Sequence, residues 1–325
     1  MTELIETPVL FGPEKNLFGM LTQPQARSSG VGILLLNTGV NHRIGPHRIN
    51  VKIARRLALS GVTSLRFDLS GIGDSVASSS AKPFREQAID DMKAALDHLQ
   101  ERCGIRTFLV YGVCSGADNA LRLALNDPRI SGLMVFDGPS FLTRPARIER
   151  KLRRMAAFPL NAAVRDTYPW WRDMRRALAH GDAAARDRTL GRIKAWLPGR
   201  QPVMAGSIFE ADAPTLSPEQ HEKNLLSLID RGVALSLLYS VTYNSTDRNH
   251  GMLGQIAHSR VFSQAQYRFL QDVDHTATTL VMQDKLLGII EDWVRSLAPE
   301  QPLGRGRAMQ APESTDFGAL RAMTV

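Results

Sequence analysis

The stretch TFLVYGVCSGADNALRLALN, residues 107–126, determines how the rest of the chain is interpreted. It begins with apolar residues of the types that favour strands and continues into residues that favour a helix. Between the two lies GVCSG, residues 112–116, with glycine two positions before and two positions after Cys114. A strand that turns sharply into a helix leaves no room for side chains at those two positions. The pattern predicts a strand, a tight turn centred on Cys114, and a helix.

This arrangement is typical of a nucleophile elbow, in which the residue at the turn attacks the substrate. Only one register places glycine on both sides of the turn, and the residue between the glycines is then Cys114 rather than Ser115. In the alternative interpretation, the glycines serve only close packing of strand and helix, and Cys114 is a small buried hydrophobe. The flanking strand and helix favour the elbow, so Cys114 is the predicted nucleophile.

Composition places the chain among ordinary globular proteins, with 325 residues, 43% of them apolar and 22% charged. There is no run of about 18 apolar residues, so no transmembrane helix is expected. The first residues show neither the basic region nor the apolar core of a signal peptide. The two cysteines, Cys103 and Cys114, provide no disulfide framework, and a thiol nucleophile suits a reducing compartment. We therefore expect a cytoplasmic protein.

Strand-like and helix-like segments alternate along the chain. After a hairpin-like segment at residues 8–21, apolar runs typical of buried strands occur at residues 31–37, 62–67, 107–113, 130–136, 233–239 and 267–273. Helical patterns separate most of these runs, and a long insertion follows residue 138. Such alternation predicts a mostly parallel, doubly wound sheet with functional groups at the carboxyl ends of its strands.

This layout resembles the α/β-hydrolase fold with a lid over the site, across nearly all of residues 8–297. Within that superfamily the chain resembles the S33-type, serine aminopeptidase-like hydrolases that carry a cysteine elbow. The resemblance is carried by LNTGVNHRIGPHR (36–48), LRFDLSGIGDS (65–75), YGVCSGADNALR (111–122), VFDG (135–138) and DVDHTAT (272–278). It implies a hydrolase or acyltransferase of a biosynthetic pathway, and it specifies no substrate.

The resemblance also divides the chain. Residues 1–138 and 216–298 are expected to form the hydrolase core, and residues 139–215 a helical lid inserted after the strand that follows the elbow. Residues 299–325 are rich in glycine, proline and arginine and lack periodicity, so we expect a disordered tail.

Acyl transfer by a thiolate needs a base, a group that orients the base, and donors for the oxyanion. His275 is the expected base because it directly follows the last predicted strand. Asp247, in the loop after the preceding strand, is the favoured acid, and Asp137, at the end of the strand after the elbow, is the alternative. Each also has an ordinary explanation, Asp137 as a turn residue and Asp247 as half of a surface ion pair.

The oxyanion would be bound by two backbone N–H groups. One belongs to Ser115, which directly follows the nucleophile, and the resemblance implies that Val40 supplies the other. Gly39 and His42 lie in the same loop as Val40 and are expected to contact substrate, as are two aromatic residues of the lid, Trp170 and Trp171.

The net charge of +8 lies entirely in the predicted lid. Residues 139–215 contain 15 Lys and Arg against 7 Asp and Glu, and the remainder of the chain contains 25 of each kind. Arg147, Lys151 and Arg154 recur at helical spacing, opposite an apolar stripe. The ordinary interpretation is a solvated helix face. The functional one is docking of an anionic partner, such as an acyl carrier protein, a coenzyme A ester or an acidic glycan precursor, with attachment to a membrane surface as an alternative.

No cofactor, metal or nucleic acid is expected. Gly71 and Gly73 follow a predicted strand, but the third glycine of a dinucleotide fingerprint is missing. No metal-ligand spacing and no nucleic-acid recognition motif is present. The chain is therefore expected to act on a small-molecule acyl substrate through an acyl-enzyme, and the alternative is a non-catalytic ligand-binding or scaffold protein that keeps the hydrolase fold.

Overall fold

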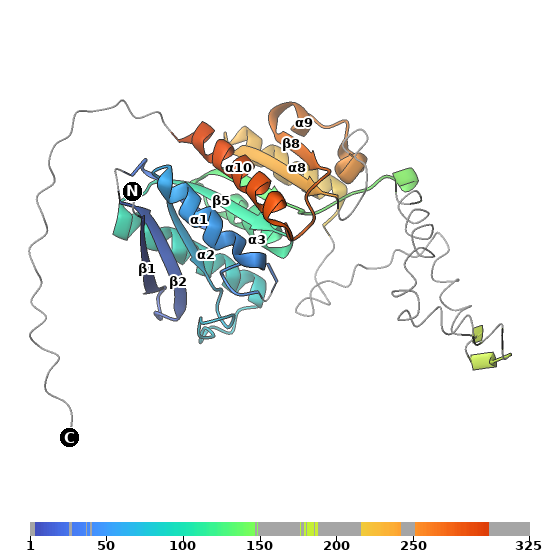
Figure 1. Cartoon of the computed structure of the whole chain (residues 1–325), viewed down its shortest axis with the longest axis horizontal. Helices are drawn as coiled ribbons and strands as arrows, with labels where there is room; N and C mark the ends of the chain where they lie inside the picture. Colours follow the sequence, from blue (N-terminus) through green and yellow to red (C-terminus); the bar gives the residue numbers. More distant parts are fainter. Residues whose placement is uncertain are drawn as a thin grey trace, which may run out of the picture.

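The computed structural model of the protein has one sheet at its centre (Figure 1). Its strands are β1 (Leu4–Phe11), β2 (Leu17–Pro24), β3 (Val31–Leu35), β4 (Thr63–Phe67), β5 (Thr107–Val113), β6 (Ile130–Phe136), β7 (Ala234–Ser240) and β8 (Gln266–Leu270). They lie in the order β1-β2-β4-β3-β5-β6-β7-β8. β2 is antiparallel to both of its neighbours, and every pair from β4 to β8 is parallel.

The structure describes residues 4–25, 28–36, 38–39, 41–146, 148, 176, 179, 181–184, 186–187, 216–241 and 251–298. The helices in these ranges include η1 (Pro46–Arg48), α1 (Ile49–Leu59), α2 (Phe84–Cys103), α3 (Ser115–Asn126), α8 (Pro218–Asp230), η2 (Gly251–Ile256), α9 (Val261–Gln264) and α10 (Leu280–Leu297).

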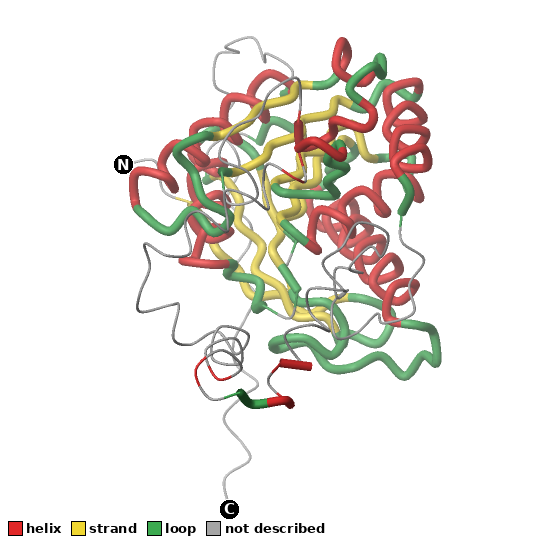
Figure 2. Tube along the Cα trace, turned by 90° about the vertical axis from the view of Figure 1, so that its right-hand side faces the viewer, coloured by secondary structure: helices red, strands yellow, loops and turns green. Residues whose placement is uncertain are grey.

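Helices cover both faces of the sheet (Figures 1 and 2). One hydrophobic core joins the sheet to α2, α3 and α8, and a second joins the opposite face to α1 and α10. The central strand β5 contributes to both, because Phe108 and Val110 point into the first core while Leu109 and Tyr111 point into the second. This alternation is the period of two that a strand imposes on its side chains. A strand buried on both faces therefore appears in the sequence as a continuous apolar run.

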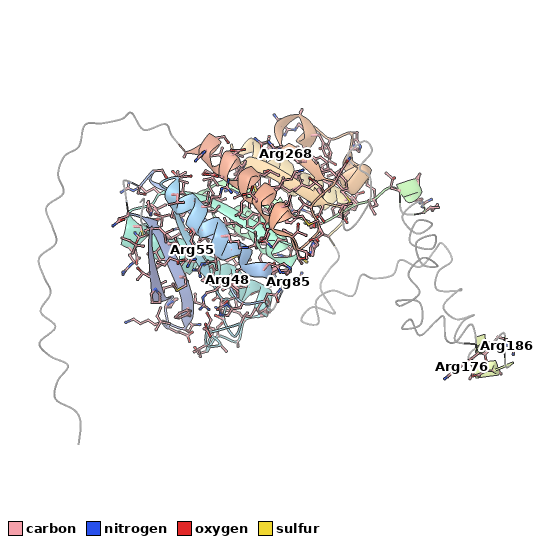
Figure 3. All side chains as sticks on the ribbon, viewed as in Figure 1. Arg48, Arg55, Arg85, Arg176, Arg186 and Arg268 are labelled. Carbon is pink, nitrogen blue, oxygen red and sulfur yellow. The ribbon has the colours of Figure 1, made fainter. Side chains whose placement is uncertain are left out.

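The predicted fold class is confirmed as an α/β-hydrolase fold with a mostly parallel, doubly wound sheet. Residues 251–264 contain two short helices, η2 and the four-residue α9. One local expectation was inaccurate. The last strand was expected to reach residue 273, but β8 ends at Leu270. This edge strand carries the exposed Arg268 (Figure 3), and a charge there discourages pairing with another chain.

Most of the predicted lid (139–215) and all of the predicted tail (299–325) lie outside the described residues, so their structure remains a prediction. Within the described ranges, no helix combines the length and apolarity needed to cross a membrane.

Candidate active site

The elbow has the tight turn that its glycines predict. β5 ends at Val113, α3 begins at Ser115, and Cys114 between them has φ 57° and ψ −121°. A Cβ atom at Gly112 would lie 2.1 Å from the carbonyl oxygen of Gly116, so position 112 accepts only glycine. The strained backbone is held by hydrogen bonds from Cys114 N–H to the Phe136 carbonyl at 3.0 Å and from Ala117 N–H to the Cys114 carbonyl at 3.0 Å. The turn places Cys114 at the carboxyl edge of the sheet, half-buried.

His275 lies in the loop between β8 and α10, and its ring meets the carboxylate of Asp137. The distance from His275 Nδ1 to Asp137 Oδ2 is 2.8 Å. Asp137 is buried and directly follows β6. Ser240, the last residue of β7, donates to the same carboxylate twice, from its backbone N–H to Oδ1 and from its hydroxyl to Oδ2, both at 2.6 Å. The ends of β6 and β7 thus hold the Asp137 carboxylate in place, and this carboxylate in turn holds the imidazole of His275 in the loop after β8.

The backbone at this edge is strained at several points. Cys114 and Asp137 have φ of 57° and 51°, and Ala277, two residues after His275, has φ 48°. Non-glycine residues rarely adopt such values, and they tend to do so at functional sites, where the surrounding structure holds them in place.

The charges of Cys114 and His275 depend on one another. The hydrogen bond with Asp137, together with the one with Cys114, raises the pKa of His275 to about 10. The hydrogen bond with His275 lowers the pKa of the Cys114 thiol, and the Ser115 backbone N–H adds to this effect. Both shifts favour a thiolate beside an imidazolium, the reactive form of a cysteine.

Several predicted site residues lie outside the described ranges. Asp247, the acid favoured by its position in the sequence, is one of them, and the carboxylate found against His275 is that of the alternative, Asp137. The others are Val40, Trp170, Trp171, Arg147, Lys151 and Arg154. Gly39 is described, and its N–H donates to the Ser115 hydroxyl oxygen at 2.5 Å.

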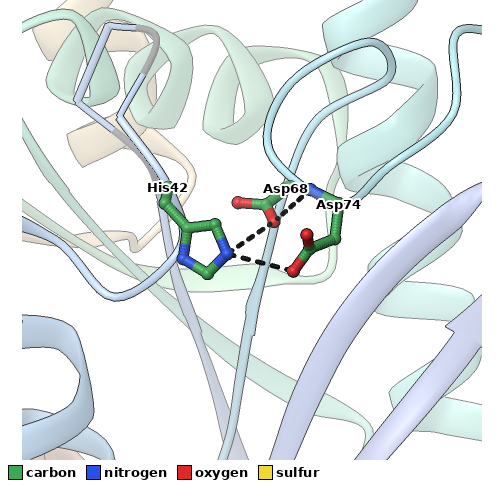
Figure 4. Close-up of side chains that lie close together, drawn as sticks. All are labelled: His42, Asp68 and Asp74. Atoms are coloured by element: carbon green, nitrogen blue, oxygen red, sulfur yellow. Dashed lines mark hydrogen bonds and ion pairs between the residues drawn. The ribbon is translucent and has the colours of Figure 1, made fainter.

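His42 takes part in a charged cluster that the sequence did not reveal (Figure 4). Its Nε2 lies 3.1 Å from Asp74 Oδ2 and 3.7 Å from Asp68 Oδ2. Arg43 joins all three, since its Nη1 is 2.5 Å from Asp68 Oδ2 and 2.7 Å from both Asp74 Oδ2 and His42 Nε2. The cluster ties the loop after β3 to the loop after β4. Contact of His42 with substrate remains a prediction.

The same cluster has the composition of a cation site, because the ligand atoms of His42, Asp68 and Asp74 lie within 4.8 Å of one another. The Arg43 guanidinium, however, already lies between these atoms and supplies the positive charge that two carboxylates need. The donor set therefore does not fit a resident metal ion.

Comparisons with known proteins agree with this fold. Residues 33–189 match the sequence model of the family described as serine aminopeptidase, S33. Among solved structures, the chain is similar to an esterase from Pyrococcus furiosus, with 14% identity, a TM-score of 0.53 and coverage of 91% of either chain. It is also similar to the esterase domain of a Rhodothermus marinus protein, with 14% identity, a TM-score of 0.50 and coverage of 90% of this chain and 99% of that one. At such identity the likeness shows the fold. No curated protein sequence matches the chain.

Proposed function

We propose that this chain, which has the α/β-hydrolase fold and matches the S33 family model over residues 33–189, transfers acyl groups through an acyl-Cys114 intermediate. The observation that carries this proposal is the hydrogen-bonded series Cys114, His275 and Asp137 at the carboxyl ends of β5, β8 and β6. It contains a nucleophile, a base and a group that orients the base, which are the parts that acyl transfer needs.

The mechanism follows from the charges of the pair. The Cys114 thiolate attacks the substrate carbonyl carbon, and the carbonyl π electrons move to oxygen, which becomes the oxyanion. The N–H of Ser115, at the positive end of the α3 dipole, binds this oxygen. Collapse of the intermediate expels the leaving group, which takes the His275 proton. His275, now neutral, then accepts a proton from water or another nucleophile as this attacks the thioester, and the second collapse restores the thiolate.

We propose Asp137 as the acid. Its contact with Nδ1 fixes the tautomer, so that Nε2 faces the thiol, and its two bonds from Ser240 keep the carboxylate in place. A histidine Nδ1 accommodates one close partner, and that position is filled by Asp137. Asp247 would then serve outside the triad.

An acyl thioester is the donor that we favour. Exchange of one thioester for another is nearly balanced in free energy, so a cysteine nucleophile suits a thioester on a carrier or on coenzyme A. The lid charge supports such a donor, because residues 139–215 carry the entire net charge of +8 and both kinds of donor are anionic.

The proposal is tested by incubating the protein with a panel of acyl thioesters and p-nitrophenyl esters and recording its intact mass. We expect a mass increase equal to one acyl group, located at Cys114 by peptide mapping. If no donor acylates the protein while iodoacetamide still alkylates Cys114, the alternative of a non-catalytic ligand-binding protein would be supported.

The paired charges also predict how cysteine reactivity depends on pH. Cys114 should react with iodoacetamide with a midpoint below the ordinary thiol pKa of 9.0, because its hydrogen bond with His275 lowers its pKa. Cys103 is an internal control, since burial raises the pKa of its thiol. At pH 7 we expect Cys114 to react at least ~10-fold faster than Cys103. The two rates are measured by peptide mapping across pH 5–10.

In the His275→Ala protein, the midpoint for Cys114 should move upward toward the ordinary value, and that of Cys103 should not move. An unchanged Cys114 midpoint would show that His275 is not its partner.

The lid proposal makes a separate prediction. Reversal of Arg147, Lys151 and Arg154 to glutamate should raise the KM for a carrier-bound substrate by about tenfold and leave kcat unchanged, because the charges act on recruitment and not on the chemistry. Salt should have the same effect on the unmodified protein, since the Debye length is ~8 Å at physiological ionic strength. Steady-state kinetics with carrier-bound and small neutral substrates measure both effects. If the variant lost equal activity on the two substrates, without salt dependence, the charged residues would be only a solvated helix face.

A further inference from the structure

The side chain of Ser115 joins the elbow to the loop after β3. Its Oγ accepts a hydrogen bond from the Gly39 N–H at 2.5 Å. Ser115 is the first residue of α3 and directly follows Cys114, and its own N–H is directed to the Cys114 sulfur. Gly39 has φ 57°, and Thr38, beside it, donates from its hydroxyl to the Val113 carbonyl at 3.4 Å. The loop is therefore fastened to the elbow on either side of the nucleophile.

A serine hydroxyl carries one donor and two acceptor lone pairs. The Gly39 N–H occupies one lone pair and fixes the rotamer of the side chain. Among the residues that the structure describes, no acceptor is present for the hydroxyl proton. The Ser115 side chain is also only half-buried. A hydroxyl donor is thus held in a fixed position next to the nucleophile, and no described residue competes with a substrate for its proton.

We propose that the Ser115 hydroxyl is a catalytic oxyanion donor, oriented by the Gly39 amide. This inference rests on the acyl-Cys114 mechanism and assigns a further donor to it. As Cys114 attacks the carbonyl carbon, the hydroxyl donates its hydrogen to the oxygen that becomes negative, and no covalent bond to Ser115 forms or breaks. The Gly39 N–H polarises the hydroxyl from the other side, and hydrogen bonds arranged in series strengthen one another.

The backbone N–H and the side-chain hydroxyl of Ser115 have different roles in this proposal. The backbone N–H of Ser115 is present whatever residue occupies the position, and it acts on the thiolate of the resting enzyme as well as on the oxyanion. The hydroxyl is specific to serine or threonine, and its partner in the resting state is Gly39. Removal of the hydroxyl should therefore affect reactions that build an oxyanion and leave other reactions of the thiolate unaffected.

Two reactions of the same sulfur provide that separation. Acylation by p-nitrophenyl acetate passes through an oxyanion, whereas alkylation by iodoacetamide displaces iodide at a saturated carbon and forms none. For Ser115→Ala we expect the acylation rate constant to fall by about 100-fold, the size of effect found when one oxyanion donor is removed. The alkylation rate at pH 7 should remain within about threefold. Ser115→Thr, which keeps a hydroxyl, should recover most of the acylation rate.

Ser131→Ala is the matched control, because it removes a serine hydroxyl that donates to the Phe108 carbonyl at 3.2 Å, at the other end of β6 from Asp137. It should change neither reaction. If Ser115→Ala does not fold, Ser115→Val, which has the shape of the Ser115→Thr side chain without its hydroxyl, should show the same selective loss.

Equal acylation by the Ser115→Ala and unmodified proteins would overturn the inference. Equal losses of acylation and alkylation would also overturn it, because they would show that the hydroxyl acts on the thiolate. Failure of the proposed function has a different outcome, in which the unmodified protein is alkylated at Cys114 but is acylated by none of the esters and thioesters.

Discussion

The Cys114→Ala protein is expected to form no acyl adduct with any donor that acylates the unmodified protein. Loss of the nucleophile should reduce turnover by a factor on the order of 10⁶, the scale found when a triad nucleophile is removed. The fold should persist, because alanine keeps the Cβ atom and the turn is held by backbone hydrogen bonds to Phe136 and Ala117. Intact mass spectrometry measures the adduct, and circular dichroism measures the fold.

Cys103→Ala is the matched control, because it removes the other cysteine from the end of α2 and should leave acylation unchanged. Ser115→Ala should slow acylation without removing the site of attachment. An adduct that persists in Cys114→Ala and disappears in Ser115→Ala would show that the elbow register is wrong.

The elbow could be predicted because its determinants are local. The steric conflict between position 112 and the Gly116 carbonyl follows from the turn itself, so the spacing of two glycines and the flanking patterns suffice to locate it. The sheet could be predicted for a related reason. Strands buried on both faces leave continuous apolar runs, and their alternation with helices determines the parallel order.

The acid could not be assigned in this way. The loop after β6 contains Asp137, and the loop after β7 contains Asp247. Each aspartate lies at a plausible distance from His275 along the chain. Which carboxylate contacts His275 depends on where each strand ends in space relative to its neighbours in the sheet. That is a tertiary property, and no sequence pattern encodes it. The two hydrogen bonds from Ser240 to Asp137 could not be predicted from the sequence either, because a serine at the end of a strand has many ordinary roles.

The charged cluster that joins the loop after β3 to the loop after β4 could not be predicted from the sequence either. Gly71 and Gly73 could be excluded as a dinucleotide fingerprint, but their purpose could not be predicted. The structure shows that a Cβ atom at Gly73 would lie 2.4 Å from Asp68 Oδ2, the oxygen that Arg43 binds. Glycine at position 73 therefore makes room for the ion pair that joins the two loops.

The identity of the acid can be decided by comparing Asp137→Asn with Asp247→Asn. Asp137→Asn should reduce the acylation rate by about 10⁴-fold, as the corresponding change does in a serine triad where it imposes the wrong tautomer. The carboxylate accepts hydrogen bonds from His275 and Ser240 on both of its oxygens, whereas the asparagine amide has a single acceptor oxygen. Asp247→Asn should change the rate by less than about threefold, since we place that residue outside the triad.

The pH dependence of the same variants separates an orienting role from a structural one. The Asp137 carboxylate is the largest cause of the rise of the His275 pKa to about 10, so its neutralisation should lower that pKa toward the ordinary value of 6.5. The imidazolium is then lost at a lower pH, and the midpoint for Cys114 alkylation should rise toward that of an ordinary thiol. Asp247→Asn should leave the midpoint unchanged. If Asp247→Asn instead caused the larger loss and moved the midpoint, the acid would lie in the loop after β7, and the contact between Asp137 and His275 would not be the one used in catalysis.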